Sequence, residues 1–226
     1  ITRMKLPFIE KYKNMIGLRI NSPLRKGPKR DFVFIHINKT AGTSIVSYTG
    51  KPFRKHLTAK EVIDVIGKDK WDSAYKFTVV RNPWDKMLSH YKHNIKTKPG
   101  SMVSRGGKQP VPFAEWLNRT LGPDKDERYY NRPQHFLPQV EWLKDYQGRI
   151  SMDSVIHFEA LADGYRWVAE DLGLPKNLPH LNATNSSKYR DFYDAASRQL
   201  VAQWFWEDLE AFGYAFDADG HETPPA

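Results

Sequence analysis

The sequence contains no cysteine, which excludes disulfide bonds, thiolate-bound zinc and a thiol nucleophile. It also lacks an apolar run of the ~18–20 residues that a membrane-spanning helix needs, and it shows no signal peptide with a basic start and an apolar core. The absence of cysteine fits a reducing compartment, so we expect a cytoplasmic protein. The first residue is Ile1 rather than Met, and an upstream leader or anchor stays open as an alternative.

Acidic residues are scarce at the N-terminus. Residues 1–30 contain nine Lys and Arg residues and one Glu, so this segment carries +8 of the formal net charge of +9. We interpret it as a basic N-terminal arm, which is either a solvated tail or a surface that contacts an acidic polymer or a membrane. Residues 31–226 are nearly neutral and long enough for one hydrophobic core, which predicts a single domain and disfavours a nucleic-acid-binding protein.

Strand and helix patterns alternate along this domain. "DFVFIHI" (31–37) and "YKFTVV" (75–80) are rich in β-branched and aromatic residues, as in strands buried on both faces, and "VIHFEAL" (155–161) contains a shorter strand. Helical patterns follow each of them, and apolar spacing predicts a long C-terminal helix over 194–212. The alternation predicts an α/β fold with a mostly parallel sheet flanked by helices.

Local signals place two helix starts. Thr58 followed by Glu61 is a capping box, in which each side chain bonds the backbone N–H of the other residue. Pro83 suits the first turn of a helix that continues through "WDKMLSHYKHNI". His90 and His93 lie on that helix without a third ligand at a suitable spacing, so we interpret them as part of a solvated basic face rather than a metal site.

The first predicted strand leads into a stretch of small and hydroxyl residues. In order, this stretch consists of Lys39, Thr40, Ala41, Gly42, Thr43 and Ser44. Small side chains at a helix start let backbone N–H groups reach an anion, and the hydroxyls add donors. The triphosphatase loop G-x-x-x-x-G-K-[ST] does not match, because here the lysine precedes the only glycine. We predict a phosphate-binding loop in which Lys39 lies over a bridging or leaving oxygen.

The same loop contains a glycosylation sequon, formed by Asn38, Lys39 and Thr40. A glycan at Asn38 would block any ligand of the loop. The sequon therefore counts against passage through a glycosylating compartment and agrees with the expected location.

The second predicted strand also ends at a cation. Arg81 follows it, and Ser89 lies about two helical turns further on. Because ligands bind beyond the carboxyl ends of parallel strands, Arg81 and Ser89 can face one further phosphate near the Lys39 loop. Two such elements predict a nucleotide that is phosphorylated at two places. A structural ion pair between Arg81 and a neighbouring element is the alternative.

Taken together, "INKTAGTSI" and "FTVVRNPWDKMLSHY" resemble the two signatures of sulfotransferases that use 3′-phosphoadenosine 5′-phosphosulfate (PAPS). The resemblance is to the carbohydrate-type branch, which includes heparan sulfate 2-O- and 6-O-sulfotransferases and bacterial relatives. It extends from about residue 31 to residue 216, through "HLTAKEV", "HFEALAD" and "EDLEAFGYAF".

The resemblance implies a P-loop-like sulfotransferase fold and a role for each motif. The loop from Lys39 to Ser44 would bind the 5′-phosphosulfate, with Lys39 stabilising the bridging oxygen as the sulfuryl group departs. Arg81 and Ser89 would bind the 3′-phosphate, and the polar loop around Lys188 would close over the nucleotide. The product would be adenosine 3′,5′-bisphosphate.

In-line transfer to an alcohol needs a general base, and we predict His56, which precedes the capped helix between the two phosphate motifs. A contact with the first turn of that helix is the alternative role for His56. His36 is interpreted as a strand side chain, and His135 either lines the acceptor site or shapes a loop. No metal is expected, because Lys39, Arg81 and the loop amides supply the positive field.

The acceptor is expected to be a hydroxyl group on a glycan or glycoconjugate. Residues 86–108 contain six Lys and Arg residues and no acidic residue, so an acidic acceptor can dock there. Two other functions stay open at this point. A small-molecule or nucleoside kinase shares the architecture but should show the triphosphatase loop and a magnesium carboxylate. A non-catalytic nucleotide-binding module would keep Lys39 and Arg81 without depending on His56.

Overall fold

The computed structural model describes residues 22–51, 54–104, 107–178 and 189–217, which fold around a sheet of strand order β1-β2-β3-β4. Its strands are β1 (Leu24–Arg25), β2 (Phe32–Ile35), β3 (Tyr75–Val80) and β4 (Ser154–His157). β2, β3 and β4 run parallel, and β1 pairs antiparallel with β2. The predicted α/β fold with a mostly parallel sheet is confirmed. β3 has the predicted bounds, and all six of its residues are buried, as expected of a central strand.

The sheet begins earlier in the chain than the expected domain boundary at residue 31. In β1, Leu24 pairs with Val33 and Arg25 with Phe32, so the last part of the expected arm belongs to the sheet. Residues 1–21, which hold the rest of that arm, lie outside the described residues.

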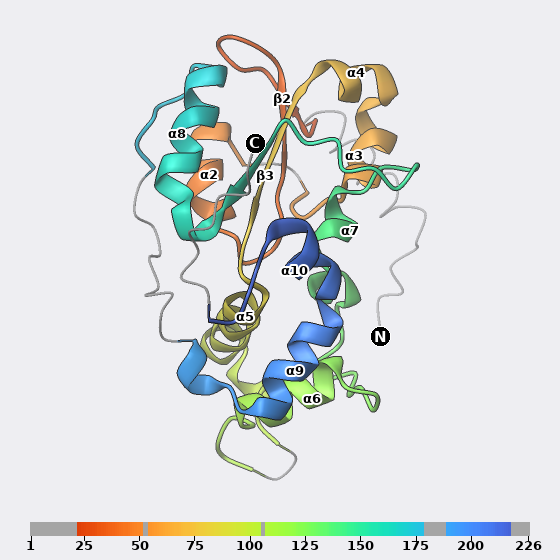
Figure 1. The fold of residues 1–226 in the computed structure, drawn as a ribbon, viewed down its shortest axis with the longest axis vertical. Coiled ribbons are helices and arrows are strands. Elements are labelled where there is room, and N and C mark those ends of the chain that lie inside the picture. The colour runs from red at the N-terminus through yellow and green to blue at the C-terminus, as the bar shows by residue number, and fades with distance from the viewer. Residues whose placement is uncertain (1–21, 52–53, 105–106, 179–188, 218–226) are drawn as a thin grey trace, which may run out of the picture.

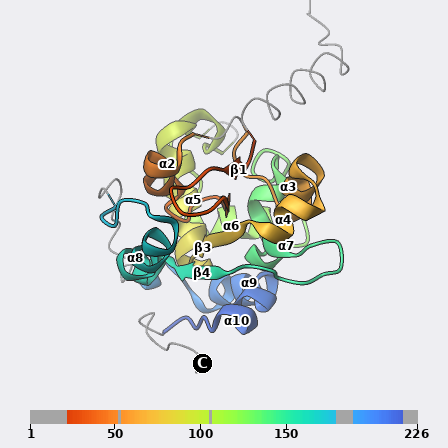
Figure 2. The same ribbon diagram turned by 90° about the horizontal axis from the view of Figure 1, so that it is seen from above.

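Helices cover both faces of the sheet. The helices of the described residues are α2 (Gly42–Thr49), α3 (Ala59–Ile66), α4 (Lys68–Ser73), α5 (Pro83–Thr97), α6 (Phe113–Leu121), α7 (Gln139–Leu143), α8 (Leu161–Leu172), α9 (Ala195–Trp204) and α10 (Trp206–Phe212). In Figures 1 and 2, α2 and α8 lie on one side of the strands and α3, α4 and α7 on the other. Each side has its own apolar core: Phe77 packs with α2 and α8, and Ile35 packs with the other three.

Both predicted helix starts are confirmed. Thr58 and Glu61 form the capping box of α3, with the Glu61 N–H donating to Oγ1 of Thr58 at 3.3 Å and the Thr58 N–H donating to Oε2 of Glu61 at 2.8 Å. Pro83 is at the first turn of α5, where its missing N–H costs no helical hydrogen bond. α5 thus begins three residues after β3 ends, and this short connection carries Arg81.

The predicted long C-terminal helix is wrong in one respect, because it is broken at Phe205 into α9 and α10. Phe205 has φ −110° and ψ 26°, and its side chain is fully buried. The turn redirects the chain so that Asp208, also fully buried, reaches the N-terminus of α7. Amphipathic spacing continues across the break, so the sequence pattern does not reveal it.

A third apolar cluster joins α5, α6 and α9 below the sheet in Figure 1, at the carboxyl ends of the parallel strands.

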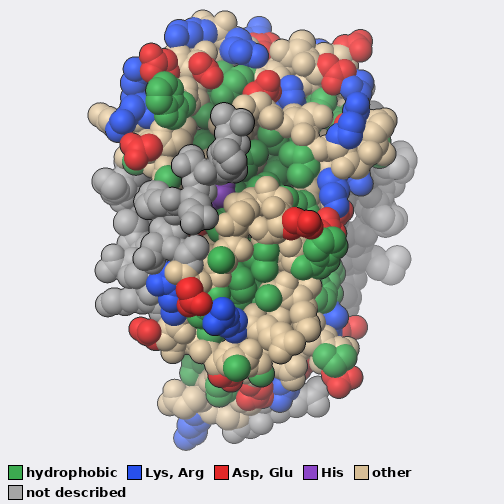
Figure 3. All heavy atoms as spheres, viewed as in Figure 1, with side chains coloured by type: hydrophobic (Ala, Val, Ile, Leu, Met, Phe, Trp, Pro, Cys, Tyr) green, Lys and Arg blue, Asp and Glu red, His purple; other side chains and the backbone are tan. Residues whose placement is uncertain are grey.

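Figure 3 shows one face of the molecule, where Lys and Arg side chains alternate with Asp and Glu around hydrophobic residues. Within the described residues, no helix combines the length and apolar character required to cross a membrane.

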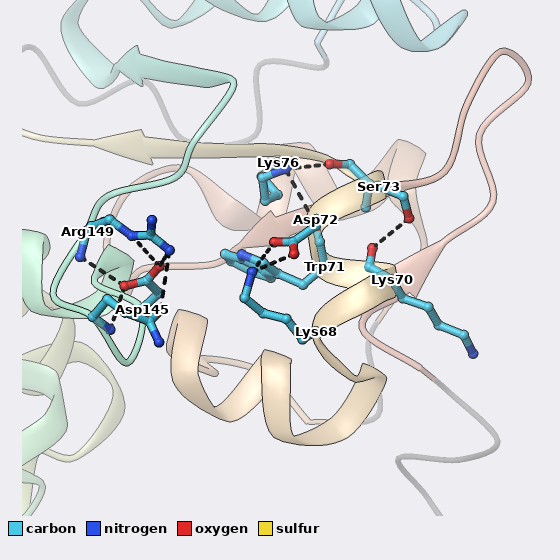
Figure 4. Close-up of polar contacts among 10 residues, drawn as sticks. Lys68, Lys70, Trp71, Asp72, Ser73, Lys76, Asp145 and Arg149 are labelled. Carbon is cyan, nitrogen blue, oxygen red and sulfur yellow. Dashed lines mark hydrogen bonds and ion pairs between the residues drawn. The ribbon is translucent and has the colours of Figure 1, made fainter.

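Lys76 is a buried cation at the start of β3, and its side chain turns back to the end of α4 (Figure 4). Its Nζ donates to the carbonyl oxygen of Ala74 at 2.7 Å and lies 3.1 Å from the carboxylate of Asp153. Lys68 instead pairs with Asp72 on the exposed surface of α4. The two lysines differ mainly in burial, since their side chains are 9% and 48% exposed.

We expect Lys76→Met to lower the free energy of unfolding by about 2 kcal/mol, because it leaves a helix-end carbonyl and a carboxylate without their cation. Lys68→Met is the matched control, and it should cost about 0.5 kcal/mol or less, as exposed ion pairs do. Urea unfolding followed by tryptophan fluorescence measures both changes. Equal losses in the two variants would contradict a structural role for Lys76.

Candidate active site

A cleft of about 1030 Å³ lies at the carboxyl ends of the parallel strands. It brings together the loop after β2, the connection after β3 and the segment before α3. The predicted site residues that line it are Lys39, Thr40, Ala41, Gly42, Thr43, Ser44, His56, Arg81 and Ser89. Lys188 lies outside the described residues. The volume is large enough for a nucleotide-sized ligand.

Backbone strain is concentrated in this cleft. In the part of the chain that the structure describes, three residues other than glycine have a positive φ: Lys39 at 66°, Ala41 at 61° and His56 at 62°. All three line the cleft. The left-handed region costs such residues of order 1 kcal/mol or more, and strain of this kind is retained where a site requires it. The strain at Lys39 and Ala41 has no sequence signal, whereas histidine is a residue type that is enriched at positive φ.

The loop after β2 is shaped for an anion. Ala41 is the N-cap of α2, and the amides of Gly42 and Thr43 lie in the first turn, where a helix provides no intrahelical acceptor. The Thr40 hydroxyl is directed elsewhere, since it donates to the carbonyl oxygen of Ile37 at 2.9 Å and closes the turn. A Cβ atom on Gly42 would lie 1.7 Å from Nε2 of His36, so glycine is needed for the His36 ring to pack here.

Arg81 connects the two phosphate motifs. Its Nη1 donates to the carbonyl oxygen of Lys39 at 3.1 Å, while its Nε and Nη2 lie 2.8 and 2.7 Å from one carboxylate oxygen of Asp85. Burial lowers the pKa of Lys39 to about 8, and the charge of Arg81 adds to this effect. Burial raises the pKa of Asp85 although Arg81 opposes the shift. The ion pair considered as an alternative for Arg81 is thus present, inside the cleft rather than away from it.

His56 is held in one tautomer. Its Nδ1 lies 3.0 Å from the backbone carbonyl oxygen of His36, and because a carbonyl can only accept, Nδ1 carries the proton and Nε2 is the basic nitrogen. Burial lowers the pKa of His56; the bond to the His36 carbonyl raises it, and the charges of Lys55 and Lys39 lower it again. The neutral ring can therefore accept a proton at neutral pH. Gln134 fixes the strained backbone by donating to the His56 carbonyl oxygen at 3.1 Å.

Further histidines extend from His56 along the cleft. The ring centroids of His36 and His135 lie 4.4 and 6.0 Å from that of His56. Mainly through burial, the pKa of His36 is lowered to about 3 and that of His135 to about 4, so both rings are neutral. The solvated face predicted for His90 is wrong, because its ring is buried and stacks on Phe136 at 4.9 Å. Among the described residues, no group of side chains is arranged to hold a metal ion.

Positive charge dominates the cleft. Two acidic residues, Asp85 and Glu159, lie among ten Lys and Arg residues. The ten are Lys39, Lys55, Arg81, Lys92, Lys96, Lys98, Arg128, Arg132, Arg166 and Lys176. A low-dielectric cleft with one sign of charge concentrates anions, so it favours a ligand with several negative charges.

Several supporting residues were not predicted. Asp85 could have been found, because it lies four residues after Arg81, at the spacing of a helical ion pair. Gln134 and Gln139 carry no such local signal, since they act on backbone atoms that are distant in sequence. Asn38, the sequon residue, is buried and donates to the carbonyl oxygen of His135 at 3.2 Å, so it is not accessible to a glycan in the folded chain.

Comparisons with known proteins agree with the two motifs. A sequence profile described as the sulfotransferase family matches residues 24–215. Carbohydrate sulfotransferase 10 of Xenopus laevis is 23% identical over 175 residues, which are 65% of this chain and 49% of that protein. The chain thus spans about half the length of this curated relative. A crystal structure of a sulfotransferase from Alicyclobacillus acidocaldarius aligns with a TM-score of 0.35 and 17% identity, over 68% of this chain and 63% of the other.

Proposed function

The chain belongs to the sulfotransferase family, and we propose that it transfers a sulfuryl group from PAPS to a hydroxyl group of a carbohydrate. One observation carries the proposal: a single cleft joins the anion-shaped loop at Lys39, the buried Arg81 and a neutral His56 whose Nε2 is the basic nitrogen. Family membership supports sulfuryl transfer as the reaction. The identity of the donor, the identity of the acceptor and the roles of the individual residues are our proposals.

The donor fits the two anion-binding elements. The amides of Gly42 and Thr43, with the Ser44 hydroxyl, are proposed to bind the 5′-phosphosulfate at the start of α2. Arg81 is buried and Lys39 is partly buried, and an anion between these cations would offset the cost of removing them from water. Ser89 lines the same cleft two turns into α5 and is proposed to share the 3′-phosphate with Arg81.

The chemistry proposed is an in-line displacement at sulfur. The acceptor hydroxyl oxygen forms a bond to sulfur while its proton passes to Nε2 of His56. The bond between sulfur and the bridging oxygen breaks, and that oxygen leaves on the 5′-phosphate of adenosine 3′,5′-bisphosphate. Lys39 stabilises the negative charge that develops on the leaving oxygen. Arg81 holds Lys39 in place by donating a hydrogen bond to the Lys39 carbonyl oxygen.

The acceptor proposed is a carbohydrate with acidic groups. The relative from Xenopus laevis is called a carbohydrate sulfotransferase, which supports a glycan. Exposed cations at the rim of the cleft, Lys92, Lys96, Lys98 and Arg132, support an acidic one. These lysines lie within or just after α5, as expected from the basic composition of residues 86–108.

The test is thermal stabilisation by adenosine 3′,5′-bisphosphate without metal. At one hundred times its dissociation constant a ligand adds ~2.7 kcal/mol, and we expect Tm to rise by about 5–10 °C for a chain of this size. ATP with magnesium is the comparison, since a kinase would respond to it. Stabilisation by ATP with magnesium alone would contradict the proposal. Transfer from labelled PAPS to a panel of neutral and uronate-containing glycans then identifies the acceptor class.

A further inference from the structure

The backbone of Arg81 is held by one distant side chain. β3 ends at Val80, opposite His157 of β4, so Arg81 has passed the last pair of that ladder. Oε1 of Gln139 accepts from the Arg81 N–H at 2.9 Å, and Nε2 of Gln139 donates to the Arg81 carbonyl oxygen at 2.9 Å. Both residues are almost completely buried, so these groups need protein partners. A single amide thus provides the two bonds that a neighbouring strand would otherwise provide.

Asp208 fixes the orientation of that amide. Its Oδ2 accepts from Nε2 of Gln139 at 3.2 Å and from the Gln139 backbone N–H at 2.8 Å, and its Oδ1 accepts from the Val140 N–H at 2.9 Å. Rotating the amide by half a turn would place Oε1 against a carboxylate, which cannot donate. Asp208 therefore caps α7, whose own N-cap is Pro138, and selects one orientation of Gln139.

The same arrangement determines where the Arg81 guanidinium lies. Gln139 fixes the backbone from which the side chain starts, and Asp85 binds the guanidinium at its other end. The guanidinium also lies 4.0 Å from the ring centroid of Phe158 and bonds to the Lys39 carbonyl oxygen. A shift of the Arg81 backbone would therefore be transmitted to the cleft.

We propose that Gln139, held by Asp208, is a positioning residue that places Arg81 for the 3′-phosphate of the donor, a role that rests on the proposed function. Gln139 does not line the cleft, so it acts only through Arg81. Its loss should therefore weaken ligands that carry a 3′-phosphate more than ligands that lack one. A general loss of folding would instead weaken both kinds alike.

Gln139→Met tests this distinction, because methionine has a similar shape and forms none of the three side-chain bonds. Titration calorimetry compares adenosine 3′,5′-bisphosphate with adenosine 5′-phosphosulfate, which lacks the 3′-phosphate. We expect the variant to bind the bisphosphate about tenfold more weakly, which corresponds to ~1.4 kcal/mol, and the phosphosulfate less than about threefold more weakly. Equal weakening of both ligands, or of neither, overturns the inference. If the unsubstituted chain binds neither ligand, the proposed function fails and this inference fails with it.

Gln139→Glu provides a second readout should the methionine variant not fold. The introduced carboxyl would lie beside Asp208, whose charge raises its pKa, and the buried Lys86, which interacts with Asp208, opposes that shift. When protonated it can accept from the Arg81 N–H and donate its single proton to the Arg81 carbonyl oxygen, whereas the amide also donates to Asp208. We expect the variant to prefer the bisphosphate more strongly at low pH, where this carboxyl is protonated, than at high pH, where it is charged. A preference that does not change with pH overturns the inference.

Discussion

His56→Asn is expected to lower kcat for sulfuryl transfer by about 10²- to 10⁴-fold, the usual contribution of a general base. Asparagine tolerates the positive φ of position 56, and its side-chain amide can replace Nδ1 as the donor to the His36 carbonyl oxygen. It has no nitrogen that accepts a proton at neutral pH. The variant therefore removes the base while it keeps the backbone geometry, and steady-state assays with labelled PAPS measure the loss.

Two controls separate a loss of catalysis from a loss of donor binding and from the general effect of replacing a histidine in the cleft. The dissociation constant of adenosine 3′,5′-bisphosphate should change less than about twofold, because His56 is not proposed to bind the donor. His135→Asn replaces a neighbouring ring that lies 6.0 Å away and is also neutral. We expect its kcat to fall less than tenfold, since His56, unlike His135, has its tautomer fixed by a backbone carbonyl. Near-normal turnover in His56→Asn would remove His56 as the base, whereas no transfer by the unsubstituted chain would favour the non-catalytic alternative.

The sequence predicted those parts of the fold that depend on local signals. β3 was placed at its observed bounds because the β-branched and aromatic residues of "YKFTVV" are typical of a strand buried on both faces. The start of α3 followed from the reciprocal bonds of Thr58 and Glu61. The break at Phe205 was not predictable, because its cause lies in the contact between Asp208 and the start of α7, about 70 residues away.

In the candidate site too, the residues marked by local sequence signals could be predicted, and those that depend on distant contacts could not. Lys39 and Arg81 could be chosen because each follows a buried strand, and the carboxyl ends of parallel strands meet at one edge. Their mutual contact, with the pKa of Lys39 lowered to about 8, required the tertiary structure. The burial of His90 depends on Phe136, which lies on a separate segment, so helical spacing alone placed that ring wrongly on a solvated face.

Binding of adenosine 3′,5′-bisphosphate is expected to weaken as the pH rises through about 8, the pKa to which burial and Arg81 lower Lys39. Below that pH the lysine is charged and attracts the anion; above it the free protein has lost this charge and must regain a proton when the ligand binds. One proton taken up on binding weakens the affinity by up to about tenfold per pH unit. Calorimetric titrations between pH 7 and pH 9.5, in buffers of different ionisation enthalpy, measure the affinity and the proton uptake together.

Lys39→Arg identifies the group that titrates. A guanidinium stays charged throughout this range, so the variant should bind with little dependence on pH even if its affinity at pH 7 is lower. Lys176→Arg is the matched control, because Lys176 lines the same cleft and is not proposed to contact the donor phosphates; it should retain the full dependence. An unchanged pH dependence in Lys39→Arg would show that another group titrates. Since the lowered pKa reflects a cation held out of water, the same experiment tests whether Lys39 is prepared for an anion before the donor arrives.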